Sequence, residues 1–442
     1  MSEGVDTMGL DTPPWLAVDR LLDDPGNRII VCCGAGGVGK TTTAAALGVR
    51  AAERGRKAVV LTIDPARRLA QSMGIDSLDN TPREVVGVGA DGGQLHAMML
   101  DMKRTFDEIV EAHADGERAR AILANPFYQS LSAGFAGTQE YMAMEKLGQL
   151  RARDDWDLII VDTPPSRSAL DFLDAPKRLG SFLDGKFIRV LMAPAKVGGR
   201  AGMKFLNVGM SMMTGTLSKL MGASLLKDVQ TFVAAMDTMF GGFRTRADAT
   251  FQLLQAPGTA FLVVAAPEPD ALREAAYFVE RLAAEGMPLA GLVLNRVHGS
   301  GADQLSAERA LAAAENLEER RIVDQESGKA GLRDSAAGSP ETGSPSTEGL
   351  TADVDEITLD EITLNETALN ETAVDAITAG LLRLHAERMQ VIAREQRTRD
   401  RFTSLHPEVA VAAVAALPGD VHDLAGLRAI GERLAAGVPA GA

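Results

Sequence analysis

RIIVCCGAGGVGKTTT, residues 28–43, decides how the rest of this chain is organised. An apolar run typical of a buried strand comes first, then a turn with four glycines, then a predicted helix. The spacing fits G-x-x-x-x-G-K-[ST] from Gly34 to Thr41, between a strand and a helix, as a phosphate-binding loop requires. The pattern therefore predicts a nucleoside triphosphate site. A glycine-rich turn with a chance GKT is the alternative, and the flanking pattern disfavours it.

Each residue type in this motif suits a polyphosphate. Glycines let successive backbone N–H groups turn inward, and the phosphates then lie at the positive end of the following helix. We expect Lys40 to reach the β- and γ-phosphates as a catalytic group, Thr41 to bind Mg²⁺ and Thr42 to touch the α-phosphate. The predicted nucleotide-binding residues of the loop are Gly34, Ala35, Gly36, Gly37, Val38, Gly39, Lys40, Thr41 and Thr42.

Two further apolar runs lead into an aspartate. KAVVLTI, residues 57–63, predicts a second strand and is followed by Asp64, and WDLIIVD, residues 156–162, predicts another strand that ends in Asp162. A carboxylate at the carboxyl tip of a strand beside the phosphate loop is where an active-site residue belongs. Apolar residues ending in Asp also form the Walker B arrangement, which holds the Mg²⁺ shell. We therefore expect Asp64 in the active site, and Thr41 and Asp162 at the metal.

Length and periodicity favour an α/β fold with a doubly wound, mostly parallel sheet and an inserted Met-rich helical region. We expect a P-loop ATPase domain over residues 1–324, with helical parts at about 103–152 and 186–255, that resumes over 376–442. The further expected strands are 94–100, 260–266, 289–297 and 409–417, and the further expected helices are 14–23, 41–54, one from residue 269, and 376–399.

Residues 325–375 have a different composition. They hold twelve acidic and two basic residues, which is −10 of the formal net charge of −15. Their second half repeats five residues as EITLD, EITLN, ETALN and ETAVD. An acidic, aromatic-free segment favours a disordered insertion, and a small solenoid of stacked repeats is the alternative. The rest of the chain is mildly acidic, so we expect no nucleic-acid partner.

Eight of the 18 methionines fall between Met192 and Met239, interleaved with glycines. Core packing or a dimer contact is the commoner reason for such residues, and an adaptable apolar groove is the alternative. Such a groove would suit a hydrophobic-helix client.

The two cysteines, Cys32 and Cys33, are adjacent on the first predicted strand. Neighbours on a strand point to opposite faces, so we expect core side chains rather than a disulfide or a metal clasp. The first residues are acidic without an apolar signal segment, and no run reaches the roughly 18 apolar residues of a membrane span. We expect a soluble, cytoplasmic protein with no integral membrane segment.

The polar residue Asn295 stands near the end of the predicted strand at 289–297. Its side chain can bond a base edge or cap a turn, and the residues alone leave both open.

Taken together, the loop from Gly34 to Thr42, the Asp64-Pro65-Ala66 turn and the Asp162-Thr163-Pro164-Pro165 turn resemble the deviant-Walker P-loop ATPases. Within these the chain is most similar to the arsenite-pump ATPase family, which includes the eukaryotic factor that targets tail-anchored membrane proteins. The resemblance implies a cytoplasmic dimer that closes around ATP and Mg²⁺, hydrolyses ATP and serves a protein or membrane-protein client. It also implies that Asp64 orients the attacking water, and that Asn295 and the loop beginning at Pro418 contact adenine.

The sequence departs from the family pattern at several positions. Ala35 stands where the family carries a signature lysine that reaches the partner's phosphates, and Arg67 and Ser168 replace two switch histidines. A heterodimer with a paralogue that retains the lysine is therefore the alternative to a homodimer. The zinc clasp and further cysteines are absent, so we expect neither zinc binding nor arsenite transport. DNA-partition and division-site ATPases are the runner-up analogy, which the lack of a basic face and of a membrane-binding tail disfavours.

Overall fold

The computed structural model describes residues 14–64, 68–89, 91–132, 138–164, 242, 245–319 and 359–436. The chain divides into two compact units. Unit 1 comprises Met1–Val297 and Thr398–Pro439, and unit 2 comprises His298–Arg397 with the last three residues. The Met-rich part of the expected helical region, Met192 to Met239, lies outside the described residues, and so does Ser168.

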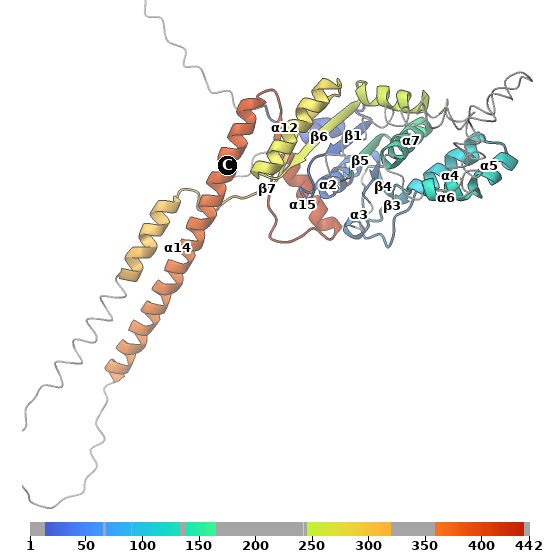
Figure 1. The fold of residues 1–442 in the computed structure, drawn as a ribbon. Coiled ribbons are helices and arrows are strands. Elements are labelled where there is room, and N and C mark those ends of the chain that lie inside the picture. Colours follow the sequence, from blue (N-terminus) through green and yellow to red (C-terminus); the bar gives the residue numbers. More distant parts are fainter. Residues whose placement is uncertain are drawn as a thin grey trace, which may run out of the picture. The chain divides into compact units, whose positions relative to one another are not determined.

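Unit 1 is built on an eight-stranded sheet with the order β3-β4-β2-β5-β1-β6-β7-β8 (Figure 1). Every strand pair is parallel except β3 with β4. The strands are β1 (Ile29–Cys33), β2 (Lys57–Thr62), β3 (Arg83–Glu84), β4 (Gln94–Met99), β5 (Leu158–Asp162), β6 (Thr259–Ala265), β7 (Leu289–Val297) and β8 (Val411–Ala415). This order confirms the predicted doubly wound, mostly parallel sheet.

Both faces of the central strands are buried, and this explains their continuous apolar sequences. One face packs against α1 (Val18–Asp23), α2 (Lys40–Glu53), α3 (Arg68–Ser72) and α15 (Leu424–Ala436). The other packs against α4 (Met102–His113), α7 (Thr138–Arg153) and α12 (Pro269–Ala284). Cys32 belongs to the first core and Cys33 to the second, which confirms that both cysteines fill the core on opposite faces.

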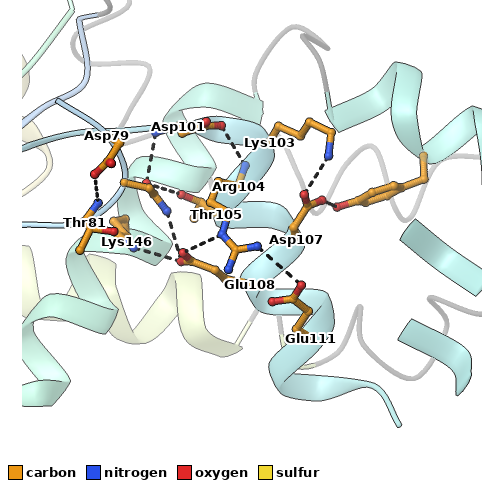
Figure 2. A network of polar contacts seen from close by, with 12 residues as sticks. Asp79, Thr81, Asp101, Lys103, Arg104, Thr105, Asp107, Glu108, Glu111 and Lys146 are labelled. Carbon is orange, nitrogen blue, oxygen red and sulfur yellow. Dashed lines mark hydrogen bonds and ion pairs between the residues drawn. The ribbon is translucent and has the colours of Figure 1, made fainter. Parts of the chain in front are cut away.

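A buried polar network ties α4 to α7 and to the loop before the β3–β4 hairpin (Figure 2). The Lys146 ammonium, on α7, lies 3.0 Å from the Glu108 carboxylate on α4, and the Asn80 amide donates to the same carboxylate. The Asn80 carbonyl in turn accepts from the buried Thr105 hydroxyl. The helices α4, α5 (Gly116–Leu123) and α6 (Pro126–Ser132) contact one another and form a group that Figure 1 labels. Figure 2 thus shows a partly buried ion pair whose carboxylate is bonded to further polar groups.

In unit 2, residues 307–319 form a helix that lies beside α14 (Leu359–Leu405), the longest helix in Figure 1. An ion pair of 2.7 Å joins Arg383 on α14 to Glu318. Residues 359–375, which belong to the acidic segment, form the first part of α14. Residues 320–358 lie outside the described ranges. A helix already formed over residues 376–405 extends into residues 359–375 at little cost, since the unfavourable nucleation step is not repeated.

None of the helices in the described ranges combines the length and the apolar composition that a membrane span needs.

Candidate nucleotide site

The loop between β1 and α2 adopts backbone angles that only glycine reaches easily. Gly37 and Gly39 have positive φ angles of 76° and 97°. A side chain at Gly34 would place its Cβ only 2.0 Å from the Val264 carbonyl oxygen, so the loop runs tightly against β6. No side chain caps the N-terminus of α2, which leaves the N–H groups of its first turn for a ligand. A loop of this shape at a helix N-terminus is an anion site.

Lys40 is the cation of this loop and is 6% exposed. Its ammonium donates a 2.7 Å hydrogen bond to the Ala35 carbonyl within the same loop. Burial lowers the pKa of Lys40, while the nearby Asp162 opposes that shift. The side chain therefore lies folded over the loop, where a phosphate would meet it.

Asp162 ends β5 next to the loop and is completely buried. One carboxylate oxygen, Oδ2, accepts hydrogen bonds from the hydroxyls of Thr41 at 2.8 Å and Thr62 at 2.9 Å. The other oxygen, Oδ1, is buried without a hydrogen-bond partner. Burial raises the pKa of Asp162 to about 6, and the two threonine bonds and Lys40 act against this rise. A buried oxygen that accepts no hydrogen bond is costly in itself.

Asp64 follows the last residues of β2 and lies at the edge of the same site. The register pairs Thr62 of β2 with Asp162 of β5, so both carboxylates stand at the carboxyl ends of neighbouring strands. The backbone before Asp64 is held by Gln139 of α7, whose amide donates to the Ile63 carbonyl at 2.9 Å. Arg67, in the turn that follows, lies outside the described residues.

Lys40, Thr41 and Asp64 line one cavity of about 410 Å³, which is large enough for a nucleotide, and Asp162 is bonded to the lining residue Thr41. The lining residues are Gly37, Gly39, Lys40, Thr41, Thr42, Asp64, Gln71, Ser72, Arg296, Asp420, Val421 and His422. Lys40, Thr41, Thr42 and Asp64 were predicted from the sequence. Gln71, Ser72 and Arg296 were missed, because no motif distinguishes them from ordinary helix and loop residues.

Asn295 is buried at the end of β7 and contacts the phosphate loop directly. Its side-chain amide donates to the Val38 carbonyl at 2.9 Å. A Cβ at Gly39 would lie 2.2 Å from that same amide nitrogen. Of the two uses that the sequence left open, the structure displays a bond to a turn, and the adenine contact stays a prediction.

The loop that begins at Pro418, which the resemblance places at the adenine, contributes residues to the cavity. Asp420, Val421 and His422 line it, whereas Pro418 is exposed and is not among the lining residues. The role of Pro418 toward adenine therefore stays a prediction.

The residues present fit a magnesium ion with a nucleotide. Mg²⁺ prefers oxygen ligands, keeps several waters and is bound through one or two protein groups plus the substrate phosphates. The Thr41 hydroxyl and the unpartnered Oδ1 of Asp162 supply such oxygens beside the loop.

Comparison with known proteins agrees with this geometry. Residues 27–327 match the family model described as anion-transporting ATPase. ATPase GET3 from Podospora anserina is 26% identical over 299 residues, 66% of this chain and 80% of that protein. ATPase GET3 from Malassezia globosa is 31% identical over 167 residues, 38% of this chain and 47% of that protein. ATPase BagA from Mycobacterium tuberculosis is 27% identical over 170 residues, which are 36% of this chain and 49% of that protein. The last two matches thus span about half the length of those relatives.

Proposed function

Because the chain belongs to the family of anion-transporting ATPases, we propose that it hydrolyses ATP with Mg²⁺ and uses the reaction to switch its own conformation. The observation that carries this proposal is the meeting of Lys40, Thr41 and Asp64 in one cavity, with Asp162 bonded to Thr41. Mg²⁺, when bound, supplies positive charge that neutralises the phosphate oxygens as the bond breaks.

The chain's own residues divide the remaining work. The loop N–H groups and Lys40 bind the phosphates and stabilise charge on the γ-phosphoryl group. Asp64 orients a water for in-line attack on the γ-phosphorus, so that a new P–O bond forms while the bond to the β-phosphate oxygen breaks. The leaving oxygen stays on ADP, and the water proton passes to the inorganic phosphate. Asp162 and Thr62 hold the Thr41 hydroxyl in place through their shared hydrogen bonds.

Asp64→Asn tests this assignment. We expect single-turnover hydrolysis to fall by about 10²-fold or more, because the neutral amide is a weaker acceptor and base toward the water than the carboxylate, while ATP affinity stays within about threefold. Asp420→Asn is the matched control, since Asp420 lines the same cavity from another loop. Hydrolysis at the wild-type rate in Asp64→Asn would show that this carboxylate has another role.

We further propose that the active form is a dimer closed around ATP, coupled to an apolar helical client through the region that contains the Met-rich segment. Two contacts of α7 support the coupling. At one end Gln139 bonds the backbone beside Asp64, and further along Glu145 bonds Arg246 at 2.7 Å in the helix of residues 245–255. Glu145 is buried and also accepts from the Tyr141 hydroxyl, so α7 joins the nucleotide site to the chain just after that segment.

Site-specific crosslinking tests the client. We expect a photoreactive group between residues 203 and 239 to label a hydrophobic-helix peptide when ATP and Mg²⁺ are present, and not without nucleotide. Equal labelling of a polar peptide of the same length would remove the support for a client site.

A heterodimer is the second candidate, and Ala35 favours it. This loop position provides no cation of its own, and cationic contacts to the transferring phosphate can be worth about 10³-fold in rate. A partner chain with a lysine at this position would supply that charge. Co-purification from the native cell decides between the two forms, because a homodimer with full activity alone would exclude the need for a paralogue.

A further inference from the structure

Large apolar side chains are concentrated on one helix of unit 2. Of the nine that the described residues expose, six lie on α14. Val374, Ile377, Leu381 and Leu384 are 57–64% exposed and follow the spacing i, i+3, i+7, i+10. In a helix this spacing places the four residues on one face, in the a and d positions of a coiled coil. We call these four residues the α14 stripe.

The helix pair of unit 2 leaves this stripe uncovered because it packs through alanines. Its buried apolar residues are Ala310 and Ala314 on the helix 307–319, and Ala379, Ala386 and, C-terminal to the stripe, Ile392 on α14. Since successive helix residues are about 100° apart, Ala379 and Ala386 lie on the face of α14 away from the stripe. Between residues 374 and 386, α14 thus buries small apolar side chains and exposes large ones, the reverse of the usual distribution.

The stripe is large enough to be an interface. Its four side chains together expose on the order of 400 Å² of apolar surface, the size of the largest patch on an ordinary monomer. Two such stripes in contact would remove on the order of 800 Å² from water, and the flanking helix surface brings this toward the size of a specific interface.

The charges of α14 indicate what covers the stripe. Residues 359–375 carry five acidic and no basic residues, whereas residues 376–405 carry six arginines and three acidic residues. Charges that complement the helix dipole act only within the first and last turns, so the dipole does not account for a division along the whole helix. A second α14 that runs antiparallel sets each acidic half beside a basic half.

The stripe gives the same arrangement its register. Its centre is at residue 379, so antiparallel pairing sets Val374 level with the partner's Leu384, and Ile377 level with the partner's Leu381. Each a position then meets a d position, as in antiparallel coiled coils.

We propose that α14 binds the α14 of a second copy of this chain as an antiparallel helix pair, independently of nucleotide. The surface differs from the nucleotide site, so the proposal holds or fails apart from the ATPase assignment. Gly380 lies beside the stripe, and a Cβ at Gly380 would meet no atom within 4 Å. This leaves room for a close helix next to the centre of the pair.

Sedimentation of the nucleotide-free full-length chain tests the pair. We expect the average molecular mass to rise reversibly from that of the monomer toward that of the dimer as the protein concentration is raised about a hundredfold. Ile377→Glu with Leu381→Glu weakens dimerisation by on the order of 100-fold or more, since each helix then sets two carboxylates into the apolar seam. Tyr277→Glu, at an exposed residue of α12, is the matched control and leaves the dimer unchanged. A monomer at every concentration, or a dimer that the double variant does not weaken, overturns the proposal.

Disulfide crosslinking tests the direction of the helices. Copies with Val374→Cys mixed with copies with Leu384→Cys crosslink to each other after mild oxidation. Either variant alone does not, because its own cysteines lie about 15 Å apart in the antiparallel pair. The natural Cys32 and Cys33 are buried and do not compete. Self-crosslinking of Val374→Cys alone would show a parallel pair and overturn the register.

Discussion

The nucleotide cavity of unit 1 buries polar groups with incomplete partners, whereas the α14 stripe of unit 2 exposes large apolar groups. Asp162, which is bonded to the cavity residue Thr41, is fully buried, and one of its oxygens accepts no hydrogen bond. On the stripe, Leu381 and Leu384 are more than 60% exposed while alanines fill the interior of the helix pair. Both arrangements cost stability in the isolated chain. Under the two proposals a charged ligand would relieve the cost in the cavity, and an apolar helix would relieve the cost at the stripe.

Loss of the loop cation should give the largest effect and should be confined to the cavity. We expect Lys40→Met to lower ATP turnover by about 10³-fold or more, because no other loop side chain compensates the γ-phosphate charge. Lys103→Met is the matched control, since Lys103 is exposed on α4 and pairs with Asp107. Dimerisation through α14 should be unchanged in both. If Lys40→Met abolished the nucleotide-free dimer, the two regions would not be independent.

The pH dependence of stability should reveal the cost of the buried carboxylate. The pKa of Asp162 is raised to about 6, above its ordinary value of 3.8, so the folded chain holds this proton where the unfolded chain has lost it. Its contribution favours folding at low pH and is lost as pH rises through about 6. Without Mg²⁺ and nucleotide, we therefore expect Asp162→Asn to be more stable than the wild type at pH 8, by on the order of 2 kcal/mol, and similar at pH 4, close to the ordinary pKa of the carboxyl.

Urea unfolding at the two pH values measures this difference. Asp155→Asn, at an exposed residue close in sequence, is the control, and its stability relative to the wild type should not change between the two pH values in this way. A wild type that is more stable than Asp162→Asn at pH 8 without ligands would mean that the carboxylate is already satisfied.

The same substitution should have opposite signs in the two regions. Gly39→Ala forces a side chain to φ 97° and against the Asn295 amide, so we expect a loss of about 2 kcal/mol or more in stability. Gly37→Ala has the positive φ but no atom within 4 Å, so its loss should be smaller. Gly380→Ala lies in a helix with open space around it and should gain about 0.5–1 kcal/mol. Urea midpoints with helical signal from circular dichroism rank the three, and a gain at Gly39 would contradict the tight loop described here.

The sequence predicts the two regions unequally. Gly34 to Thr41 fixes strand, turn and helix within a few residues, so the loop, its lysine and the two aspartates follow from local pattern. The bond from Asn295 to Val38 joins residues 257 positions apart, and no local pattern contains it. The two-residue strand β3 was missed because it is too short for any periodicity.

Residues 359–375, the part of the acidic segment that belongs to α14, show another limit of prediction from the sequence. Its composition favours disorder, but composition does not include the helix that continues from residue 376. The stripe was also missed, since Val374, Ile377, Leu381 and Leu384 look like the ordinary core face of a helix. Only the buried alanines on the opposite face show that these four residues are uncovered.

Calorimetric titration of ATP into the Asp64→Asn chain, with and without Mg²⁺, tests the central claim most directly. This variant keeps ATP intact during the titration. We predict one binding event per chain, whose heat disappears when Lys40→Met is added and whose Mg²⁺ dependence disappears when Asp162→Asn is added. Absence of ATP binding, or binding that neither substitution alters, would contradict a triphosphate held by this loop with Asp162 at its metal.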